Sequence, residues 1–172
     1  MKVYLDNVIV CGRIRSDIEP TEMAAVRKLE QQPYCEHVKI LTSRESWREQ
    51  EQTCDPGLRE KFRQSRDDVP VVQNDYRLLG FFHLQDQYGG FIANPIKTHI
   101  VDAPLLAYLK TEGLKDNDAL HLMYAVFNGC QRFVTVDPHF LDRRKPLEVR
   151  CQGLSIVKPS ELIAELSKSL SP

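Results

Sequence analysis

The chain has 172 residues, of which 42% are hydrophobic and 27% are charged, a composition typical of one globular domain with its own core. Its 23 Lys and Arg residues stand against 24 Asp and Glu residues, so the net charge of -1 does not indicate a nucleic-acid-binding protein. No stretch approaches the roughly 18 apolar residues of a membrane span, and the N-terminus lacks the pattern of a signal peptide. We therefore expect a cytoplasmic protein without a membrane partner.

In its first half the chain alternates between apolar runs and segments of helical periodicity. In chain order the predicted elements are a strand over 3–5 with its exit at 8–10, a helix over 21–32, a strand over 38–41, a helix that follows Ser43 and a polar surface helix over 58–65. Pro33 is expected to end the first of these helices, because proline cannot continue a helical hydrogen-bond ladder. This alternation favours a parallel sheet.

The segment from about 78 to 103 breaks the alternation with aromatic residues, Gly89-Gly90 and Asn94-Pro95. We treat it as an atypical insertion into a single domain that spans 1–172. Beyond it the predicted elements are a helix over 104–110, a helix over 118–128, strands over 132–136 and 154–157, and a helix that begins at Pro159. The predicted fold class is α/β, a three-layer α/β/α sandwich with a mostly parallel central sheet.

The five cysteines predict reduced thiols rather than a disulfide framework. They are odd in number and scattered, and no signal peptide accompanies them: Cys11, Cys35, Cys54, Cys130 and Cys151. The five histidines are equally dispersed, and neither residue type has the short ligand spacings of a zinc site.

Acidic residues stand at the edges of three apolar segments. Asp6 follows the first predicted strand, Asp137 follows the strand over 132–136, and Asp118 opens a predicted helix. The carboxyl ends of strands form the usual ligand crevice of an open α/β sheet, so these carboxylates can meet at one edge. Such a cluster favours a divalent cation, and Mg²⁺ or Mn²⁺ prefers carboxylate oxygens and retained waters.

The order and spacing of four short motifs resemble the PIN-domain ribonucleases. The motifs are Val3-Tyr4-Leu5-Asp6-Asn7, Thr42-Ser43 followed by Glu49, Asp118-Ala119-Leu120-His121-Leu122 and Thr135-Val136-Asp137. The resemblance spans nearly the whole chain and implies a PIN-like fold. It also implies a metal-dependent endoribonuclease, a hydrolase of RNA phosphodiester bonds, that acts as the toxin of a type II toxin-antitoxin pair. Its expected partners are an RNA substrate, a small antitoxin protein and a second copy of the chain in a homodimer.

The resemblance assigns catalysis and metal binding to Asp6, Glu49, Asp118 and Asp137, which together would hold Mg²⁺ or Mn²⁺. One or two such ions can activate the attacking water and stabilise the leaving oxygen. Ordinary structural roles remain alternatives, because Asp6-Asn7 and Asp137-Pro138 are also turn formers and Asp118 can cap its helix. Glu45 is the alternative second acid, because it lies four residues before Glu49 on the same helix face.

Some neighbours of these acids are expected to shape the site rather than to react. Asn7 and Ser43 are interpreted as turn or site-shaping residues, and His121 as a packed or hydrogen-bonded helix residue rather than a general base. Thr135 lies two residues before Asp137, and its hydroxyl could order a carboxylate or a metal-bound water. Asp116 is a weaker acidic neighbour of Asp118.

Local positive charge could still bind RNA. Basic residues near the site segments are Arg13, Arg15, Arg44, Arg48, Arg132, Arg143, Arg144 and Lys145, although each is also an ordinary surface residue. The aromatic residues of 81–91 predict a hairpin or flap that stacks on bases or, more simply, packs against the domain or a dimer partner.

Two other functions are kept open. The near-neutral charge and the long middle segment favour a PIN-like module that binds RNA or protein and is catalytically weak. A 5′-nuclease acting on DNA is a third hypothesis, for which the chain offers no obvious module that grips a duplex.

Overall fold

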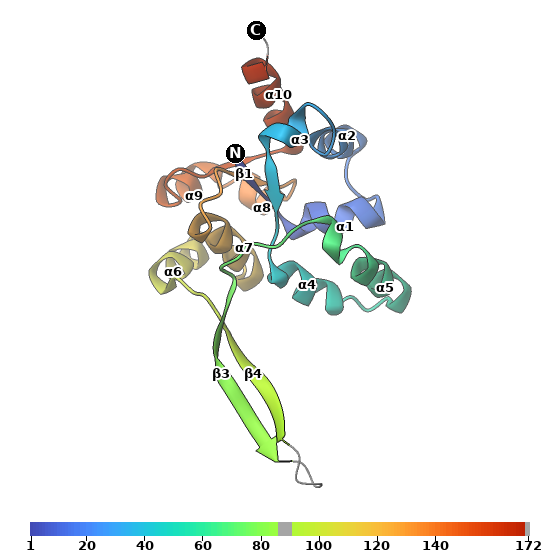
Figure 1. The fold of residues 1–172 in the computed structure, drawn as a ribbon. Helices are drawn as coiled ribbons and strands as arrows, with labels where there is room; N and C mark the ends of the chain where they lie inside the picture. The colour runs from blue at the N-terminus through green and yellow to red at the C-terminus, as the bar shows by residue number, and fades with distance from the viewer. Residues whose placement is uncertain (86–90, 171–172) are drawn as a thin grey trace.

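Figure 1 shows the computed structural model, which describes residues 1–85 and 91–170, and within 77–85 and 91–99 describes the backbone. Its central sheet has four strands: β1 (Lys2–Leu5), β2 (Lys39–Leu41), β5 (Arg132–Val134) and β6 (Ser155–Val157). Their order is β2-β1-β5-β6, and every neighbouring pair is parallel. The predictions of an α/β fold and a parallel sheet are confirmed.

The helices precede and follow these strands in the order that a parallel sheet requires. In the first half they are α1 (Asn7–Arg15), α2 (Pro20–Leu29), α3 (Tyr34–His37), α4 (Arg44–Glu51) and α5 (Pro56–Gln64), followed by the 3-10 turn η1 (Arg66–Asp68). In the second half they are α6 (Ala103–Thr111), α7 (Asp116–Phe127), α8 (Pro138–Leu141), α9 (Arg144–Arg150) and α10 (Pro159–Leu170).

The alternation of side chains along β1 divides the core into two clusters. Val3 and Leu5 belong to a cluster with residues of α1, α2 and α10, whereas Tyr4 belongs to a cluster with residues of α6, α7, α8 and α9. Val134 and Phe133 of β5 divide in the same way. The sheet therefore has helices on both faces, an arrangement compatible with a three-layer α/β/α fold.

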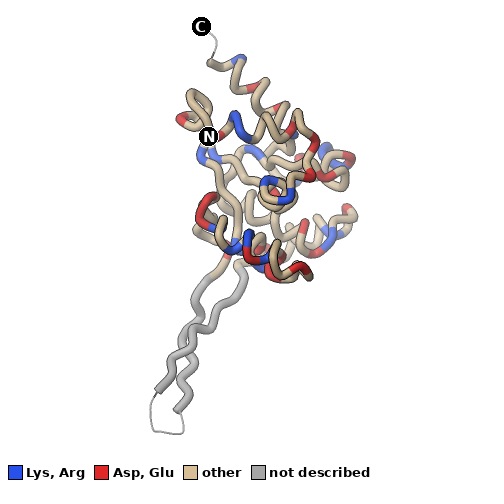
Figure 2. Tube along the Cα trace, turned by 90° about the vertical axis from the view of Figure 1, so that its right-hand side faces the viewer, with Lys and Arg blue, Asp and Glu red and all other residues tan. Residues whose placement is uncertain are grey.

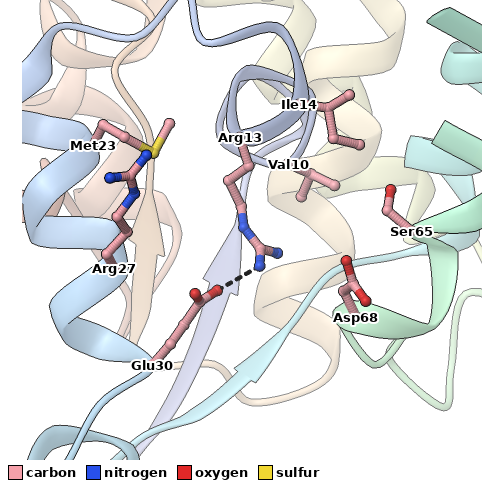
Figure 3. A pocket seen from close by; sticks show the side chains of 8 residues that line it. All are labelled: Val10, Arg13, Ile14, Met23, Arg27, Glu30, Ser65 and Asp68. Carbon is pink, nitrogen blue, oxygen red and sulfur yellow. Dashed lines mark ion pairs between the residues drawn. The ribbon is translucent and has the colours of Figure 1, made fainter. Parts of the chain in front are cut away.

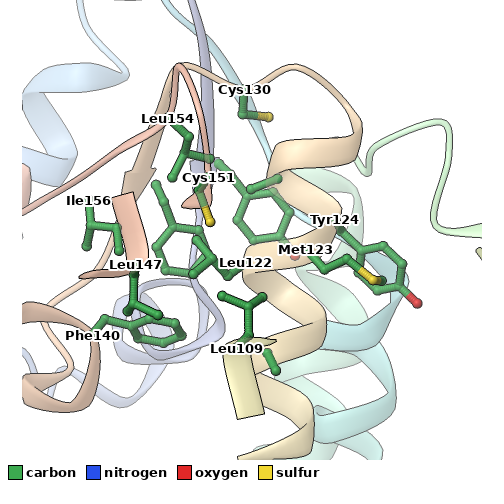
Figure 4. Packing of buried hydrophobic residues seen from close by; sticks show 14 of the residues in the cluster. Leu109, Leu122, Met123, Tyr124, Cys130, Phe140, Leu147, Cys151, Leu154 and Ile156 are labelled. Carbon is green, nitrogen blue, oxygen red and sulfur yellow. The ribbon is translucent and has the colours of Figure 1, made fainter. Parts of the chain in front are cut away.

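The larger cluster fills the space between the sheet and α7. Figure 4 shows Leu109, Leu122, Phe140 and Leu147 packed together there, all fully buried. Removing a side chain of this size from such a core costs about 2–5 kcal/mol, because a cavity remains after the transfer energy is lost. This layer therefore fixes α7, and with it the position of Asp118 in its first turn.

One local prediction is wrong. Residues Val8–Val10 are not an extended exit from β1, because α1 begins at Asn7 directly after Asp6. A short apolar run cannot be assigned to strand or helix by periodicity alone, and here Ile9 and Val10 are buried from a helix. The sequence also did not predict α3, α8 and α9, which have seven residues or fewer and so show little periodicity.

Among the described helices, none is long and apolar enough to cross a membrane.

Strands β3 (Tyr76–Gln85) and β4 (Phe91–His99) form a separate antiparallel ribbon that projects from the body near α4 and α6 (Figure 1). Its root is anchored by Asp75, whose buried carboxylate accepts hydrogen bonds from the backbone N–H (2.7 Å) and the guanidinium of Arg44. The ribbon occupies the segment treated above as an insertion, and the single-domain assignment stays a prediction. The predicted flap tip, Tyr88-Gly89-Gly90, lies outside the described residues.

Candidate active site

Asp6 and Thr135 meet because β1 and β5 are neighbours. Leu5 is paired with Val134, and the backbone N–H of Asp6 donates to the carbonyl of Val134 at 3.0 Å. The residues that follow this pair, Asp6 and Thr135, therefore lie together at the carboxyl edge of the sheet. There the Thr135 hydroxyl donates to Asp6 Oδ2 at 2.6 Å. Both residues are buried, with Asp6 only 4% exposed. Asp6 also occupies the N-cap position of α1, but its side chain makes no cap hydrogen bond there.

Asp137 and Asp118 approach this edge from helix starts. Asp137 is the N-cap residue of α8, and its Oδ1 accepts the N–H of His139 at 2.8 Å, so the structural role expected of it is present. Its own N–H donates to Thr135 Oγ1 at 2.9 Å. Asp118 is partly buried in the first turn of α7, where Lys115 rather than Asp118 occupies the N-cap position.

Glu45 and Glu49 of α4 have different surroundings. Glu45 is fully buried, and both of its carboxylate oxygens are bound by the guanidinium of Arg48. Glu49 instead accepts a hydrogen bond from Asn7 Nδ2 and lies 3.3 Å from His121 Nε2. Of the two, Glu49 is the one that faces the other candidate acids, because its charge acts on Asp118.

The charges of neighbouring candidate acids act on Asp6 and on Asp118. Burial raises the pKa of Asp6 to about 6; His121 and the Thr135 hydrogen bond oppose this effect, and the charges of Asp118 and Asp137 add to it. Burial likewise raises the pKa of Asp118, and the charges of Asp137 and Glu49 raise it further. The structure thus brings together acids from β1, α4, α7 and the end of β5.

His121 Nε2 and Glu49 Oε2 are in contact at 3.3 Å, and this contact is an ion pair when His121 is protonated. Burial of His121 lowers its pKa, but the hydrogen bond and charge of Glu49, with the charges of Asp6 and Glu45, leave its pKa above the ordinary value. Burial raises the pKa of Glu49, and its hydrogen bonds and charge interaction with His121 outweigh that effect, so its net pKa is lowered. As expected from the sequence, His121 is a packed and hydrogen-bonded helix residue.

The four candidate acids are of the chemical type that binds a hard divalent cation, but their side chains are not arranged as a metal site in this structure. Among the residues whose side chains the structure describes, no three His, Cys, Asp or Glu side chains are arranged so that they could hold a metal ion. Yet the acids that meet here offer carboxylate oxygens, which Mg²⁺ and Mn²⁺ prefer. Burial is the larger cause of the raised pKa values of Asp6 and Asp118, and the neighbouring negative charges that add to it are ones that a bound cation would relieve.

Most of the basic residues expected near the site are paired with acids. Six of the eight named above, all in the described part of the chain, form ion pairs: Arg13, Arg15, Arg44, Arg48, Arg132 and Arg144. Figure 2 shows Lys and Arg interspersed with Asp and Glu over the body, with no broad basic face in that view.

A cavity of about 230 Å³ lies elsewhere, beside α1 and α2 (Figure 3). Arg13 and Glu30, which form an ion pair at 2.8 Å, line it together with Met23 and Asp68. None of the four candidate acids lines this cavity.

Sequence reasoning did not single out two polar groups that support the acids. Tyr4 hydrogen-bonds both Ser43 and His121, and Cys11 donates from its thiol to Asn7 Oδ1 at 3.2 Å. A tyrosine within an apolar strand was the available signal, since a buried phenol hydroxyl needs a hydrogen-bond partner.

No protein-family model, curated protein or solved structure matches the chain. The resemblance to PIN-domain ribonucleases therefore rests on the motif residues alone.

Proposed function

We propose that this chain is a PIN-like endoribonuclease that hydrolyses RNA phosphodiester bonds with Mg²⁺ or Mn²⁺. One observation carries the proposal: acids from four distant segments meet at the carboxyl edge of a parallel sheet, where Thr135 links Asp6 to Asp137 and Asn7 binds Glu49. The four acids are Asp6, Glu49, Asp118 and Asp137. The order of the motifs and a layer arrangement compatible with α/β/α support the PIN assignment.

Each residue has a definable part in such a reaction. The four acids would hold the cation, which when bound supplies an activated water and compensates the negative charge that develops on the phosphate. Thr135 holds Asp6 in one orientation, and Asn7 with His121 holds Glu49. Lys115 is exposed, and its positive charge partly opposes the rise in the pKa of Asp118. It can therefore contact a phosphate beside the acids.

The substrate is proposed to be single-stranded or loop RNA. The described body lacks a broad basic face in the view of Figure 2, and a duplex is held chiefly by many phosphate contacts. A flexible strand needs fewer such contacts, because its backbone can bend toward an edge of carboxylates and cation. The toxin role, the antitoxin partner and the homodimer stay predictions from the resemblance.

Cleavage of a labelled mixed RNA pool tests the proposal. The purified protein is incubated with Mn²⁺ or Mg²⁺, beside an EDTA control and the Asp118→Asn variant. The matched control is Asp116→Asn, because Asp116 lies two residues away in the same helix but is exposed and pairs with Lys110 at 2.9 Å. We expect metal-dependent cleavage that Asp118→Asn abolishes and Asp116→Asn retains. Equal cleavage by a folded Asp118→Asn protein contradicts the assigned site.

A catalytically weak RNA- or protein-binding module is the second candidate. The observation in its favour is that the acids, within the described residues, are not arranged as a metal-holding group. RNA binding that is unaffected by EDTA, together with no cleavage under either cation, distinguishes this function from the nuclease.

A further inference from the structure

We propose that a buried hydrogen-bonded chain from Ser43 through Tyr4 to His121 holds the carboxylate of Glu49, making His121 a positioning residue for divalent-cation binding. The inference rests on the proposed function and names what keeps its second acid in place. Tyr4 lies in β1, Glu49 in α4 and His121 in α7. Ser43 lies between β2 and α4.

The chain is continuous through four side chains. His121 Nε2 lies 3.3 Å from Glu49 Oε2, and His121 Nδ1 lies 2.7 Å from the Tyr4 hydroxyl. That hydroxyl donates to Ser43 Oγ at 2.7 Å. Each polar atom of the imidazole ring therefore has a described partner, and the ring plane is fixed from both sides.

The members behind Glu49 are rigidly enclosed. Tyr4 and Ser43 are fully buried, and His121 is 1% exposed. The Tyr4 ring is stacked on Phe133, with centroids 5.5 Å apart and planes inclined by 9°. Ser43 occupies the N-cap position of α4 without making a side-chain cap bond. Its hydroxyl is therefore hydrogen-bonded to Tyr4 instead of capping α4.

The direction of the last hydrogen bond does not depend on the charge of His121. An ionised carboxylate can only accept, so Nε2 carries the hydrogen whether the ring is neutral or protonated. The Tyr4 hydroxyl has a single hydrogen, so beside a protonated ring it accepts from Nδ1 and donates to Ser43, whereas beside a neutral ring it donates to Nδ1 and accepts from the Ser43 hydroxyl. His121 therefore presents a donor to Glu49 in either state.

A second support reaches the same carboxylate oxygen from α1. The Cys11 thiol donates to Asn7 Oδ1, which orients the amide so that Nδ2 donates to Glu49 Oε2. Two donors on one oxygen, from α1 and α7, restrict rotation of the carboxylate, whose side chain is 18% exposed. Partners that orient a ligating carboxylate in this way typically change metal affinity by about 10- to 100-fold when removed.

Substitutions at His121 separate positioning from packing. His121→Gln keeps an amide nitrogen near the place of Nε2, whereas His121→Leu keeps the volume and removes the donor. Tyr4→Phe removes only the hydroxyl behind the ring. Tyr124→Phe is the matched control, because it removes another buried tyrosine hydroxyl from the same core cluster and from the same helix as His121.

The measurement is Mn²⁺ binding by electron paramagnetic resonance titration without RNA, beside the melting temperature of each variant. We expect His121→Leu to weaken Mn²⁺ binding by about 10- to 100-fold, Tyr4→Phe to weaken it by less, and His121→Gln to recover part of the loss. Tyr124→Phe should bind like wild type. A packing role predicts the reverse order at 121, with Leu at least as good as Gln.

Two failures are distinguishable. If wild-type protein binds Mn²⁺ and His121→Leu binds it equally well, the positioning role is overturned and the proposed function stands. If correctly folded wild-type protein binds no Mn²⁺, the metal-dependent function is overturned, and this inference with it.

Discussion

The hydroxyl of Thr135 donates to Asp6 Oδ2 at 2.6 Å. The Thr135 hydroxyl oxygen in turn accepts the backbone N–H of Asp137 at 2.9 Å. One buried hydroxyl thus connects two candidate acids that follow neighbouring strands. Because a hydroxyl both donates and accepts, no apolar residue of the same shape can replace it.

Replacing Thr135 separates its shape from its hydroxyl. Thr135→Val keeps the branched volume but leaves Asp6 without this donor, so we expect Mn²⁺ affinity to fall by about 10- to 100-fold. Thr135→Ser keeps the hydroxyl and should stay close to wild type. Isothermal titration with Mn²⁺ measures both. Valine and serine variants of equal affinity would show that the hydroxyl does not order the acids.

Substitutions of the two glutamates of α4 should affect different properties, RNA cleavage for Glu49 and the stability of the fold for Glu45. Glu49→Gln should abolish metal-dependent cleavage with little change in stability, because its side chain is partly exposed at the site. Glu45→Gln should instead lower the free energy of unfolding by about 1–3 kcal/mol, because the Arg48 guanidinium loses a buried charged acceptor. RNA cleavage and urea unfolding of both variants check this. Loss of cleavage only in Glu45→Gln would make Glu45 the second acid.

Asp6 is expected to destabilise the metal-free protein at neutral pH. Its folded pKa of about 6 lies above the ordinary 3.8, so between these values the folded state binds more protons than the unfolded state. The free energy of unfolding therefore falls as pH rises from about 4 to 6, by up to about 3 kcal/mol from this group.

Asp6→Asn removes that titration. In EDTA the variant should resist urea better than wild type at pH 7.5, and the difference should shrink toward pH 4. Asp116→Asn, which alters an exposed acid, serves as the control. A variant less stable than wild type at pH 7.5 would contradict the burial effect.

The five free thiols should react in two groups. Cys35 and Cys54 are exposed, whereas the other three are buried. Burial raises the pKa of both Cys130 and Cys151 to about 11, so little thiolate is available there. Ellman's reagent should modify two thiols rapidly in the native protein and all five after unfolding. Fewer than five in guanidinium would indicate a disulfide and contradict the prediction of reduced cysteines.

Much of the fold could be predicted because its signals are local. The apolar runs at β1, β2, β5 and β6 and the periodicity of α2, α7 and α10 each lie within one element. The start of α1 could not be predicted, since Val8–Val10 suit a strand as well as a helix. The segment of the ribbon was predicted as an insertion that forms a hairpin or flap, but the pairing of β3 with β4 could not be predicted, because no local pattern fixes its register.

The site was predictable in part for the same reason. Asp6, Asp118 and Asp137 stand at element edges, which sequence shows, and strand adjacency brings Asp6 to Thr135. The preference for Glu49 over Glu45 depended on the family resemblance, whereas the structure distinguishes them by the position of Arg48. The contact between Tyr4 and His121 joins residues 117 positions apart, and no local pattern encodes such a pair.

The strand order has a consequence for synthesis. β1 is made first, yet one of its two neighbours, β5, is made near the end of the chain. A ribosome-bound chain that ends before Arg132 already contains Asp6, Glu49 and Asp118, but it lacks the strand that places Thr135 against Asp6. The carboxyl edge that gathers the candidate acids is therefore completed only when β5 emerges and pairs with β1.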